Sequence, residues 1–236
     1  AMERIWNDIV SRKMYITGGI GVSGHGEGFA SGYDLPNERA YAETCASIAM
    51  AFYSHRLACL YADARYADVF ERVLYNGLLS GVSLDGDKFF YINPLTSRGV
   101  ELFETSGGKQ GNSKQHRQHW FGCACCPSNV VRFMPTIGSY VYAQSNDSIY
   151  VNLYVNSKST VSLNGQKVKL TQKTGYPWDG DIRFTLEPEI EGKFDMYLRI
   201  PGWCGEPSLR VDGKEYELNM EKGYACIAKE WDSKNT

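Results

Sequence analysis

The feature that most constrains this fold is a change in the spacing of apolar residues near residue 147. Before about residue 145, apolar side chains in several segments recur every three to four residues, which is the period of an amphipathic helix. From Ile149 they alternate instead, with Val151, Leu153 and Val155 at every second position, which is the period of a strand. A chain with such a change folds as two differently built parts, and 236 residues are enough for both.

The first part reads as helices joined by long loops. Asp63 is placed to cap the third helix, Pro127 to occupy the first position of the fourth, and Pro135 to end or kink it. The helix at the N-terminus starts without a capping residue, and four helices are few for a closed helical domain. We therefore expect the chain to be a fragment of a longer protein. The expected helices cover about 2–12, 44–61, 64–80 and, in two pieces, 127–144.

The second part reads as short strands joined by tight turns. SLNGQKVKL and RVDGKEYEL each hold an Asn-Gly or Asp-Gly pair between alternating segments, the strongest short-range signal of a β-hairpin. Further strands are expected at about 182–187, 194–200 and 224–228, and several short strands of this kind favour a β-sandwich. The predicted fold class is therefore α+β and multi-domain, with a helical domain over residues 1–145 and a β-sandwich domain over residues 146–236.

Charge and hydropathy exclude several classes of function. The formal net charge is −2, so nothing indicates a nucleic-acid partner. No apolar run reaches the roughly 18 residues that a membrane span needs, so we expect a soluble protein. The first ten residues, AMERIWNDIV, are charged and amphipathic and do not resemble a signal peptide. The compartment stays open between cytoplasmic and periplasmic or secreted, and a homo-oligomer stays open as well.

A glycine-rich stretch, Gly19 to Gly24, matches G-x-G-x-x-G, the pattern of a dinucleotide-binding turn. That pattern binds a dinucleotide only between a strand and a helix of a βαβ unit. Here an expected helix precedes it and a loop follows. We therefore interpret the glycines as residues that let the backbone turn tightly near a site.

Three of the seven cysteines crowd into one short segment, HWFGCACCPSNVVRF. Seven is an odd number, and a disulfide framework would be even and better spread. With Pro127 as the first helical residue, Cys126 becomes the N-cap, where unpaired N–H groups and the helix dipole favour a thiolate. Metal ligation or thiol chemistry explains Cys123, Cys125 and Cys126 better than the alternative of three buried apolar residues or a chance disulfide.

A zinc site usually takes four ligands, so the cluster needs partners elsewhere in the chain. AYAETCASI offers Glu43 and Cys45, which face nearly opposite ways on a regular helix. They can share one ion only if the helix begins at about Thr44 or Cys45. Taken alone, Glu43 reads as a surface carboxylate and Cys45 as a core residue. His116 and His119 compete as ligands, and solvation or substrate contact are the other interpretations of both.

Glu27 lies among glycines in GHGEGF, beside His25. A carboxylate in such a loop is usually solvated. In a partly dry cleft, however, its pKa rises and it can donate a proton to a leaving group. Glu27 is therefore a candidate general acid/base, and His25 and His119 are candidate substrate contacts.

Two stretches together resemble glycoside hydrolase family 127, the β-L-arabinofuranosidases formerly known as domain of unknown function 1680. The stretches are GHGEGFASGYDLPNERAYAETCASIAMAFY and WFGCACCPSNVVRF. The glutamate loop, E-T-C and C-A-C-C-P occur in the family's order, which makes the likeness specific over about residues 1–145. The β part matches only in general pattern.

The resemblance implies a fold and a chemistry. The fold would be part of an (α/α)6 barrel followed by a β-sandwich, in a retaining exo-glycosidase that takes a glycan or oligosaccharide as substrate and Zn2+ as cofactor. By the same resemblance Cys125 would be the nucleophile and a zinc ligand, and Cys126, Glu43 and Cys45 would complete the zinc site. Glu27 would be the general acid/base. A fragment with these residues need not itself be active, since other parts of the barrel would carry further sugar contacts.

Two other interpretations use residues of this chain differently. A structural zinc site in a non-catalytic protein would employ the same four ligands in a closed, saturated arrangement. A carbohydrate-binding β-sandwich would use an aromatic strip on one exposed sheet face. Trp178, Trp203 and Trp231 are the candidates for that strip, although each is more simply a core residue.

Overall fold

The computed structural model describes residues 1–96 and 116–232, and the chain divides into two compact units. The first unit holds residues 1–57 and 69–135. The second unit holds residues 58–68 together with residues 136–236. Residues 58–68, which come from the end of the predicted helix at 44–61 and the start of the predicted helix at 64–80, therefore belong to the same unit as the strands. The two units are not two continuous halves of the chain.

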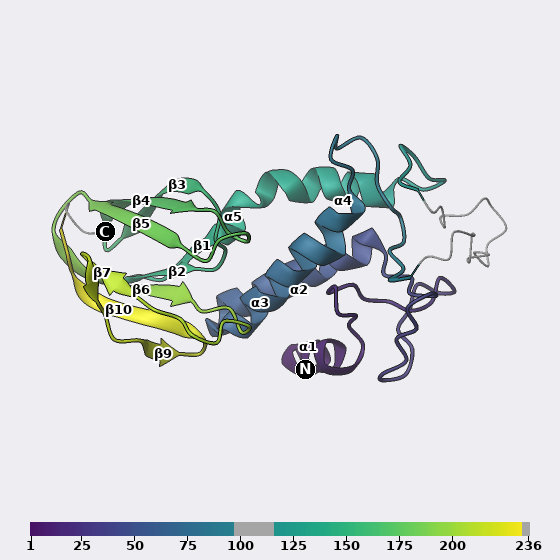
Figure 1. Ribbon diagram of the computed structural model, residues 1–236, viewed down its shortest axis with the longest axis horizontal. Helices are drawn as coiled ribbons and strands as arrows, with labels where there is room; N and C mark the ends of the chain where they lie inside the picture. Colours follow the sequence, from purple (N-terminus) through teal and green to yellow (C-terminus); the bar gives the residue numbers. More distant parts are fainter. Residues whose placement is uncertain (97–115, 233–236) are drawn as a thin grey trace. The chain divides into compact units, whose positions relative to one another are not determined.

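Helices and long loops build the described part of the first unit (Figure 1). The predicted helices at 2–12 and 44–61 are confirmed at both ends. The predicted helix at 64–80 is also confirmed as helical, but after α3 it continues as a π-helical turn and then a 3-10 turn. The bounds are α1 Met2–Arg12, α2 Thr44–Tyr61, α3 Ala64–Arg72, η1 Val73–Leu78, η2 Leu79–Gly81, α4 Cys125–Phe133 and η3 Met134–Thr136.

The helix α4 starts two residues earlier than the sequence predicts. It begins at Cys125, so the prediction that Pro127 opens this helix is wrong. The first turn of any helix leaves its N–H groups without intrahelical partners, so proline fits there beyond the first position too. Pro135 does end the helix as predicted, because α4 stops at Phe133 and a 3-10 turn follows.

Aromatic rings hold the helices of the first unit together. Phe133 of α4 is fully buried, and its ring centroid lies 5.4 Å from that of Phe52 and 6.1 Å from that of Phe70. Trp6 of α1 donates its indole N–H to Ser54 Oγ of α2 at 3.0 Å. Burying a large apolar side chain contributes about 1.5–3 kcal/mol, so this packing stabilises the contact between α2 and α4.

Two main sheets form the second unit and pack as a sandwich around one core (Figure 1). The five-stranded sheet has the order β1-β2-β6-β10-β9, the three-stranded sheet the order β3-β4-β5, and β7-β8 form a separate hairpin. Only β2 and β6 pair in parallel among these neighbours in the described strands. The bounds are α5 Gly138–Val141, β1 Tyr142–Gln144, β2 Ser148–Val151, β3 Ser157–Leu163, β4 Gln166–Thr174, β5 Ile182–Pro188, β6 Gly192–Arg199, β7 Arg210–Val211, β8 Lys214–Glu215, β9 Asn219–Glu221 and β10 Tyr224–Trp231.

Both hairpins predicted from Asn-Gly and Asp-Gly pairs are confirmed. Asn164 and Gly165 join β3 to β4 with φ of 51° and 80°. Asp212 and Gly213 join β7 to β8 with φ of 52° and 77°. Left-handed backbone at both central residues is what the tight hairpin turn needs, and asparagine, aspartate and glycine adopt it at least cost.

The three tryptophans do not make an aromatic strip on a sheet face. Trp231 is buried in the sandwich core, so the expectation of a core position is confirmed for this residue. It is wrong for Trp178 and Trp203, which are exposed and lie in loops that follow β4 and β6. The Trp203 ring stacks on Tyr176, with centroids 6.3 Å apart.

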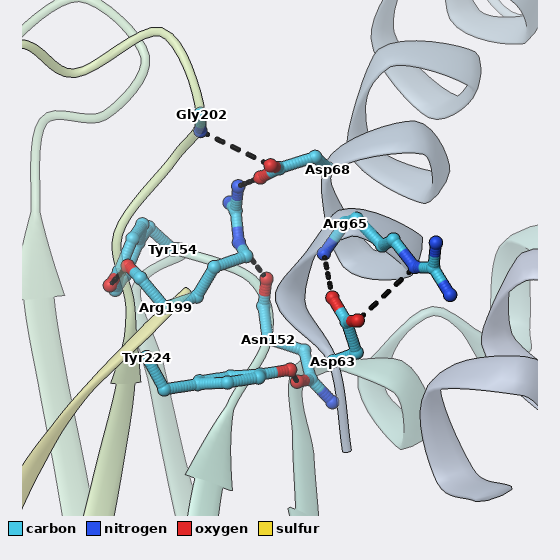
Figure 2. Close-up of polar contacts among 8 residues, drawn as sticks. All are labelled: Asp63, Arg65, Asp68, Asn152, Tyr154, Arg199, Gly202 and Tyr224. Carbon is cyan, nitrogen blue, oxygen red and sulfur yellow. Dashed lines mark hydrogen bonds and ion pairs between the residues drawn. The ribbon is translucent and has the colours of Figure 1, made fainter. Parts of the chain in front are cut away.

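Figure 2 shows a polar network that joins α3 to the sandwich within the second unit. Arg199 of β6 is fully buried; its Nη1 donates to Asp68 Oδ1 at 2.6 Å and its Nε to Asn152 O at 2.7 Å. The second Asp68 oxygen accepts the Gly202 N–H at 3.1 Å. Tyr224 donates its hydroxyl to Asn152 Oδ1 at 2.7 Å. A buried guanidinium is tolerated when it is paired and hydrogen-bonded in this way.

Candidate metal and catalytic centre

Four potential metal ligands from two distant segments meet in the first unit. Glu43 and Cys45 come from the start of α2, Cys125 and Cys126 from the start of α4, and their ligand atoms all lie within 4.8 Å of one another. The Cys126 sulfur is 3.5 Å from that of Cys45 and 3.9 Å from that of Cys125. Glu43 Oε1 is 3.5 Å from the Cys125 sulfur and 3.6 Å from the Cys126 sulfur. In the described ranges no other histidine, cysteine or acidic side chains gather in this way.

The start of α2 decides that Glu43 and Cys45 can face the same point. This helix begins at Thr44, which confirms the condition that the sequence set for a shared ion, and Glu43 lies just outside it. Thr44 donates its backbone N–H to Tyr91 O at 3.0 Å and its hydroxyl to Phe90 O at 2.7 Å. The first bond satisfies a backbone N–H that a helix start leaves unpaired, and both bonds fix where the helix begins.

Cys125 and Cys126 occupy the first two positions of α4, and Ala124 is the N-cap. The prediction that Cys126 caps the helix is therefore wrong. The first-turn N–H groups still have no intrahelical acceptors, and the helix dipole is positive there, which favours an anionic group. Burial outweighs this effect and raises the pKa of Cys125, so the prediction that the helix start by itself favours the thiolate is wrong.

The three thiols differ in how their surroundings affect ionisation. Burial raises the pKa of Cys125 to about 12. Hydrogen bonding with Cys45, together with burial, raises the pKa of Cys126. The same pairing with Cys126, assisted by the Asn129 amide, lowers the pKa of Cys45. Three thiols and the carboxylate of Glu43 cannot all carry negative charge at these distances unless a cation offsets their repulsion.

The spacing of the four donors fits a tetrahedral zinc ion. Zinc binds thiolate sulfur at about 2.3 Å, which places two sulfur ligands of a tetrahedron about 3.8 Å apart. Four of the six separations among these donors lie between 3.5 and 3.9 Å, and the other two are at most 4.8 Å. Thiolate ligands also select zinc over magnesium or calcium, which prefer oxygen. The residues therefore fit the ion in number, spacing and chemistry.

Two tyrosines connect this group to Glu27. The Tyr41 hydroxyl donates to Glu27 Oε1 at 3.4 Å, and the Tyr91 hydroxyl lies 3.1 Å from the Cys125 sulfur. The two rings pack edge to face with centroids 6.4 Å apart. Glu27 is exposed, and its backbone has φ of 47° between two glycines. The candidate acid/base and the candidate nucleophile are thus each held by one member of a packed tyrosine pair.

The other candidates lie outside the ligand group. His25 and His119 are exposed, and His119 Nδ1 lies 3.0 Å from Asp87 O. Neither they nor His116 belong to the group of four ligands. Cys123 is exposed, with its sulfur 3.5 Å from that of the candidate nucleophile. Substrate contact by His25 and His119 stays a prediction.

Sequence reasoning missed three side chains that contact the site, namely Tyr41, Tyr91 and Asn129. A signal was present for Asn129, which follows Cys125 by four residues and therefore shares its face of α4; its Nδ2 is 3.1 Å from the Cys45 sulfur. No local pattern singles out Tyr91, because its contact with the thiol depends on how two segments pack.

Comparisons with known proteins give matches over both parts of the chain. The family model of the β-L-arabinofuranosidase GH127 catalytic domain matches residues 1–139, and that of the GH127 middle domain matches residues 148–236. The chain is 36% identical over 229 residues to a non-reducing end β-L-arabinofuranosidase from Bifidobacterium longum subsp. longum. That alignment covers 95% of this chain and 34% of the relative.

Solved structures are similar along the whole chain. A GH127 β-L-arabinofuranosidase from Geobacillus stearothermophilus T6 is 46% identical with a TM-score of 0.88, over 98% of this chain and 36% of that one. A GH127 β-arabinofuranosidase is 45% identical with a TM-score of 0.89, over 100% of this chain and 37% of that one. The chain thus spans about a third of the length of these relatives. The predicted fold class, α+β with part of an (α/α)6 barrel followed by a β-sandwich, is confirmed. Among the described residues, no helix combines the length and apolar character needed to cross a membrane.

Proposed function

Because this chain belongs to glycoside hydrolase family 127, we propose that the protein is a retaining exo-glycosidase that releases β-L-arabinofuranose from a glycan or oligosaccharide. The observation that carries the proposal is the meeting of Glu43, Cys45, Cys125 and Cys126 at one point. The substrate class is supported by two relatives that are β-L-arabinofuranosidases. In this proposal residues 1–145 belong to the catalytic domain and residues 146–236 form the β-sandwich domain.

The four clustered residues would hold one Zn2+, whose charge, when it is bound, keeps the Cys125 sulfur deprotonated near neutral pH. Burial alone makes this thiol a poor nucleophile, because a group with a pKa of about 12 is almost wholly protonated at pH 7. Because burial disfavours the free thiolate, Cys125 would need the cation in order to act as the nucleophile.

Cys125 and Glu27 would divide the chemistry between them. The Cys125 sulfur attacks the anomeric carbon while Glu27 gives its proton to the glycosidic oxygen, so that a C–S bond forms as the C–O bond breaks. Glu27, now a carboxylate, then takes a proton from water, the water oxygen attacks the same carbon, and the C–S electron pair returns to sulfur. Two inversions give net retention, as in glycosidases that use two carboxylates.

Tyr41 and Tyr91 would keep the two reacting groups in place during these steps. Each hydroxyl contacts one of them, Glu27 and Cys125 respectively, and the edge-to-face packing of the rings fixes the tyrosines against each other. Holding two reacting groups in the correct geometry lowers the entropic part of the barrier.

The direct test is Cys125→Ser, with Cys59→Ser as a matched control because Cys59 is an exposed cysteine of α2. We expect the first variant to lose turnover of an aryl β-L-arabinofuranoside and the second to keep it. A Cys125→Ser enzyme with full activity would exclude the assigned role.

A trapping experiment separates a nucleophile from a mere metal ligand. In Glu27→Gln, an aryl glycoside with a good leaving group still reacts, but the intermediate lacks the base that activates water. We expect one arabinofuranosyl group on the peptide that contains Cys125, detected by mass spectrometry. Attachment to a different residue would refute this mechanism.

A structural zinc site is the second candidate, and one observation favours it. The protein itself supplies four ligands, which is the closed arrangement of structural sites, whereas catalytic sites usually keep one position open. The two candidates differ in the trapping experiment, because a structural site gives no sugar adduct at Cys125 under any condition.

A further inference from the structure

We propose that Asn129 and Arg132 are positioning residues for the metal site: Asn129 orients the Cys45 sulfur toward the ion, and Arg132 orients Asn129. The inference deepens the proposed function and rests on it, because it concerns the same four ligands. Neither side chain is itself a ligand in this proposal.

Asn129 lies on the same face of α4 as the two thiols of that helix. It follows Cys125 by four residues and Cys126 by three, the spacings that bring side chains together on a helix. Its Nδ2 is 3.1 Å from the Cys45 sulfur, which belongs to α2. α4 therefore contacts the Cys45 sulfur twice, through the Cys126 sulfur at 3.5 Å and through the Asn129 amide.

Arg132 fixes which end of the Asn129 amide meets the sulfur. Its Nη2 donates to Asn129 Oδ1 at 2.7 Å. A guanidinium has donors only, so the amide oxygen must face it, and the NH2 group is left to face Cys45. The sulfur of Cys45 therefore receives an N–H donor and not a carbonyl oxygen, whose lone pairs would repel a metal-bound thiolate.

Arg132 is held from α2 as well as from its own helix. Its guanidinium carbon lies 5.3 Å from the centre of the Phe52 ring, within the range of a cation–π contact. Phe52 follows Cys45 by seven residues, two helical turns further along α2. A chain of contacts thus runs from Phe52 of α2 through Arg132 and Asn129 of α4 and back to Cys45 of α2. The Asn129 amide cannot turn without breaking one of these contacts.

The physical consequence is a tighter metal site. A sulfur that accepts an N–H from a fixed donor has fewer orientations available and keeps a lone pair directed at the point where the ion would be held. Loss of such outer contacts typically costs 10–100-fold in metal affinity. We expect a loss in this range for Asn129→Leu, which keeps the approximate size of the side chain but removes the donor, and for Asn129→Asp, which replaces the donor by an oxygen.

Substitutions of Arg132 test the same chain of contacts, because they should lower the zinc affinity by smaller amounts than the Asn129 variants do. Arg132→Leu should weaken zinc binding less than the Asn129 variants do, because Asn129 keeps its place but loses the group that orients it. Arg132→Lys retains a donor and a cation and should recover most of the affinity. Val131→Ala is the matched control, since Val131 is on the same helix and is 71% exposed.

The experiment measures zinc affinity by competition with a chromophoric chelator, and it records the sulfur-to-metal charge-transfer absorption of the Co2+ form. Circular dichroism of the metal-free proteins shows whether each variant folds. Support is a 10–100-fold weaker affinity and an altered charge-transfer band in at least one folded Asn129 variant, with Val131→Ala unchanged.

Two results overturn the inference, and they are distinguishable. If the wild-type protein binds metal with a sulfur charge-transfer band and folded Asn129 variants bind as tightly as Val131→Ala, the positioning role is wrong while the metal site stands. If the wild-type protein shows no metal binding through sulfur, the proposed site itself fails and the positioning role fails with it.

Discussion

Replacing Asp68 by alanine should destabilise the second unit strongly, because it leaves the buried charge of Arg199 without its counter-ion. Arg199 is 0% exposed and Asp68 is 26% exposed, and their ion pair is 2.6 Å long. Breaking a buried pair by removing one partner costs about 3–5 kcal/mol. Two features reduce that figure here: Arg199 keeps its bond to Asn152 O, and Asp68 is partly screened by solvent. We therefore expect a loss of about 2–3 kcal/mol.

The assay for this prediction is amide hydrogen exchange in peptides from β6, read by mass spectrometry. A loss of about 2–3 kcal/mol corresponds to exchange that is about 30- to 150-fold faster, where exchange follows the opening equilibrium. Asp68→Asn keeps an acceptor for Arg199 and should give a smaller change. Asp212→Asn is the control, because it makes the same chemical change in the exposed pair with Lys229, 2.7 Å long. Such pairs contribute at most about 1 kcal/mol. The reasoning would be refuted if Asp68→Asn had no larger effect than Asp212→Asn.

Two further predictions concern local backbone and pH. Gly223→Ala should destabilise by about 2–3 kcal/mol in urea unfolding, because φ is 81° and the added carbon would lie 2.7 Å from Ala64 Cβ. Gly213→Ala has a similar φ of 77° with open space, so it isolates the backbone cost, and an equal loss in both variants would exclude the clash. Burial, and then the charge of Arg56, lower the pKa of His55. The unfolded chain therefore binds more protons below about pH 6.5, so stability falls as pH drops through that region. His55→Gln should flatten the fall between pH 7.5 and pH 5.5, and an unchanged slope would contradict the assignment.

The parts of the fold that were predictable are those fixed by local chemistry. The bounds of α1 follow from apolar period, and the turns at Asn164 and Asp212 follow from the low cost of left-handed backbone there. Asp63 also accepts the Arg65 N–H at 3.1 Å, as expected of a helix cap. In each case the interactions that determine the helix end or the turn are between residues a few positions apart in the sequence.

The parts that were not predictable depend on packing between distant segments. The preference of proline for the first helical position predicts that α4 starts at Pro127, but the helix begins at Cys125. Tyr91 reaches Cys125 only because its segment packs against the start of α4, and no sequence period records that contact. The exposed positions of Trp178 and Trp203 were missed for the same reason, since composition alone favours burial of large rings.

The candidate ligands could be found from the sequence, but their meeting could not. The thiol cluster stands out by composition, whereas Glu43 and Cys45 are linked to it by the resemblance and by a condition on where α2 starts. The structure satisfies that condition and brings the four donors within 4.8 Å of one another. The roles of Cys125 and Glu27 remain proposals.

The measurement that bears most directly on the whole account is the metal content and ligand shell of the purified protein. Elemental analysis and X-ray absorption at the zinc edge should find about one zinc per chain, bound by sulfur from Cys45, Cys125 and Cys126 and by oxygen from Glu43. Cys126→Ala should lose that ion. Protein that takes up no zinc when zinc is supplied, or that binds it without sulfur, would contradict the account.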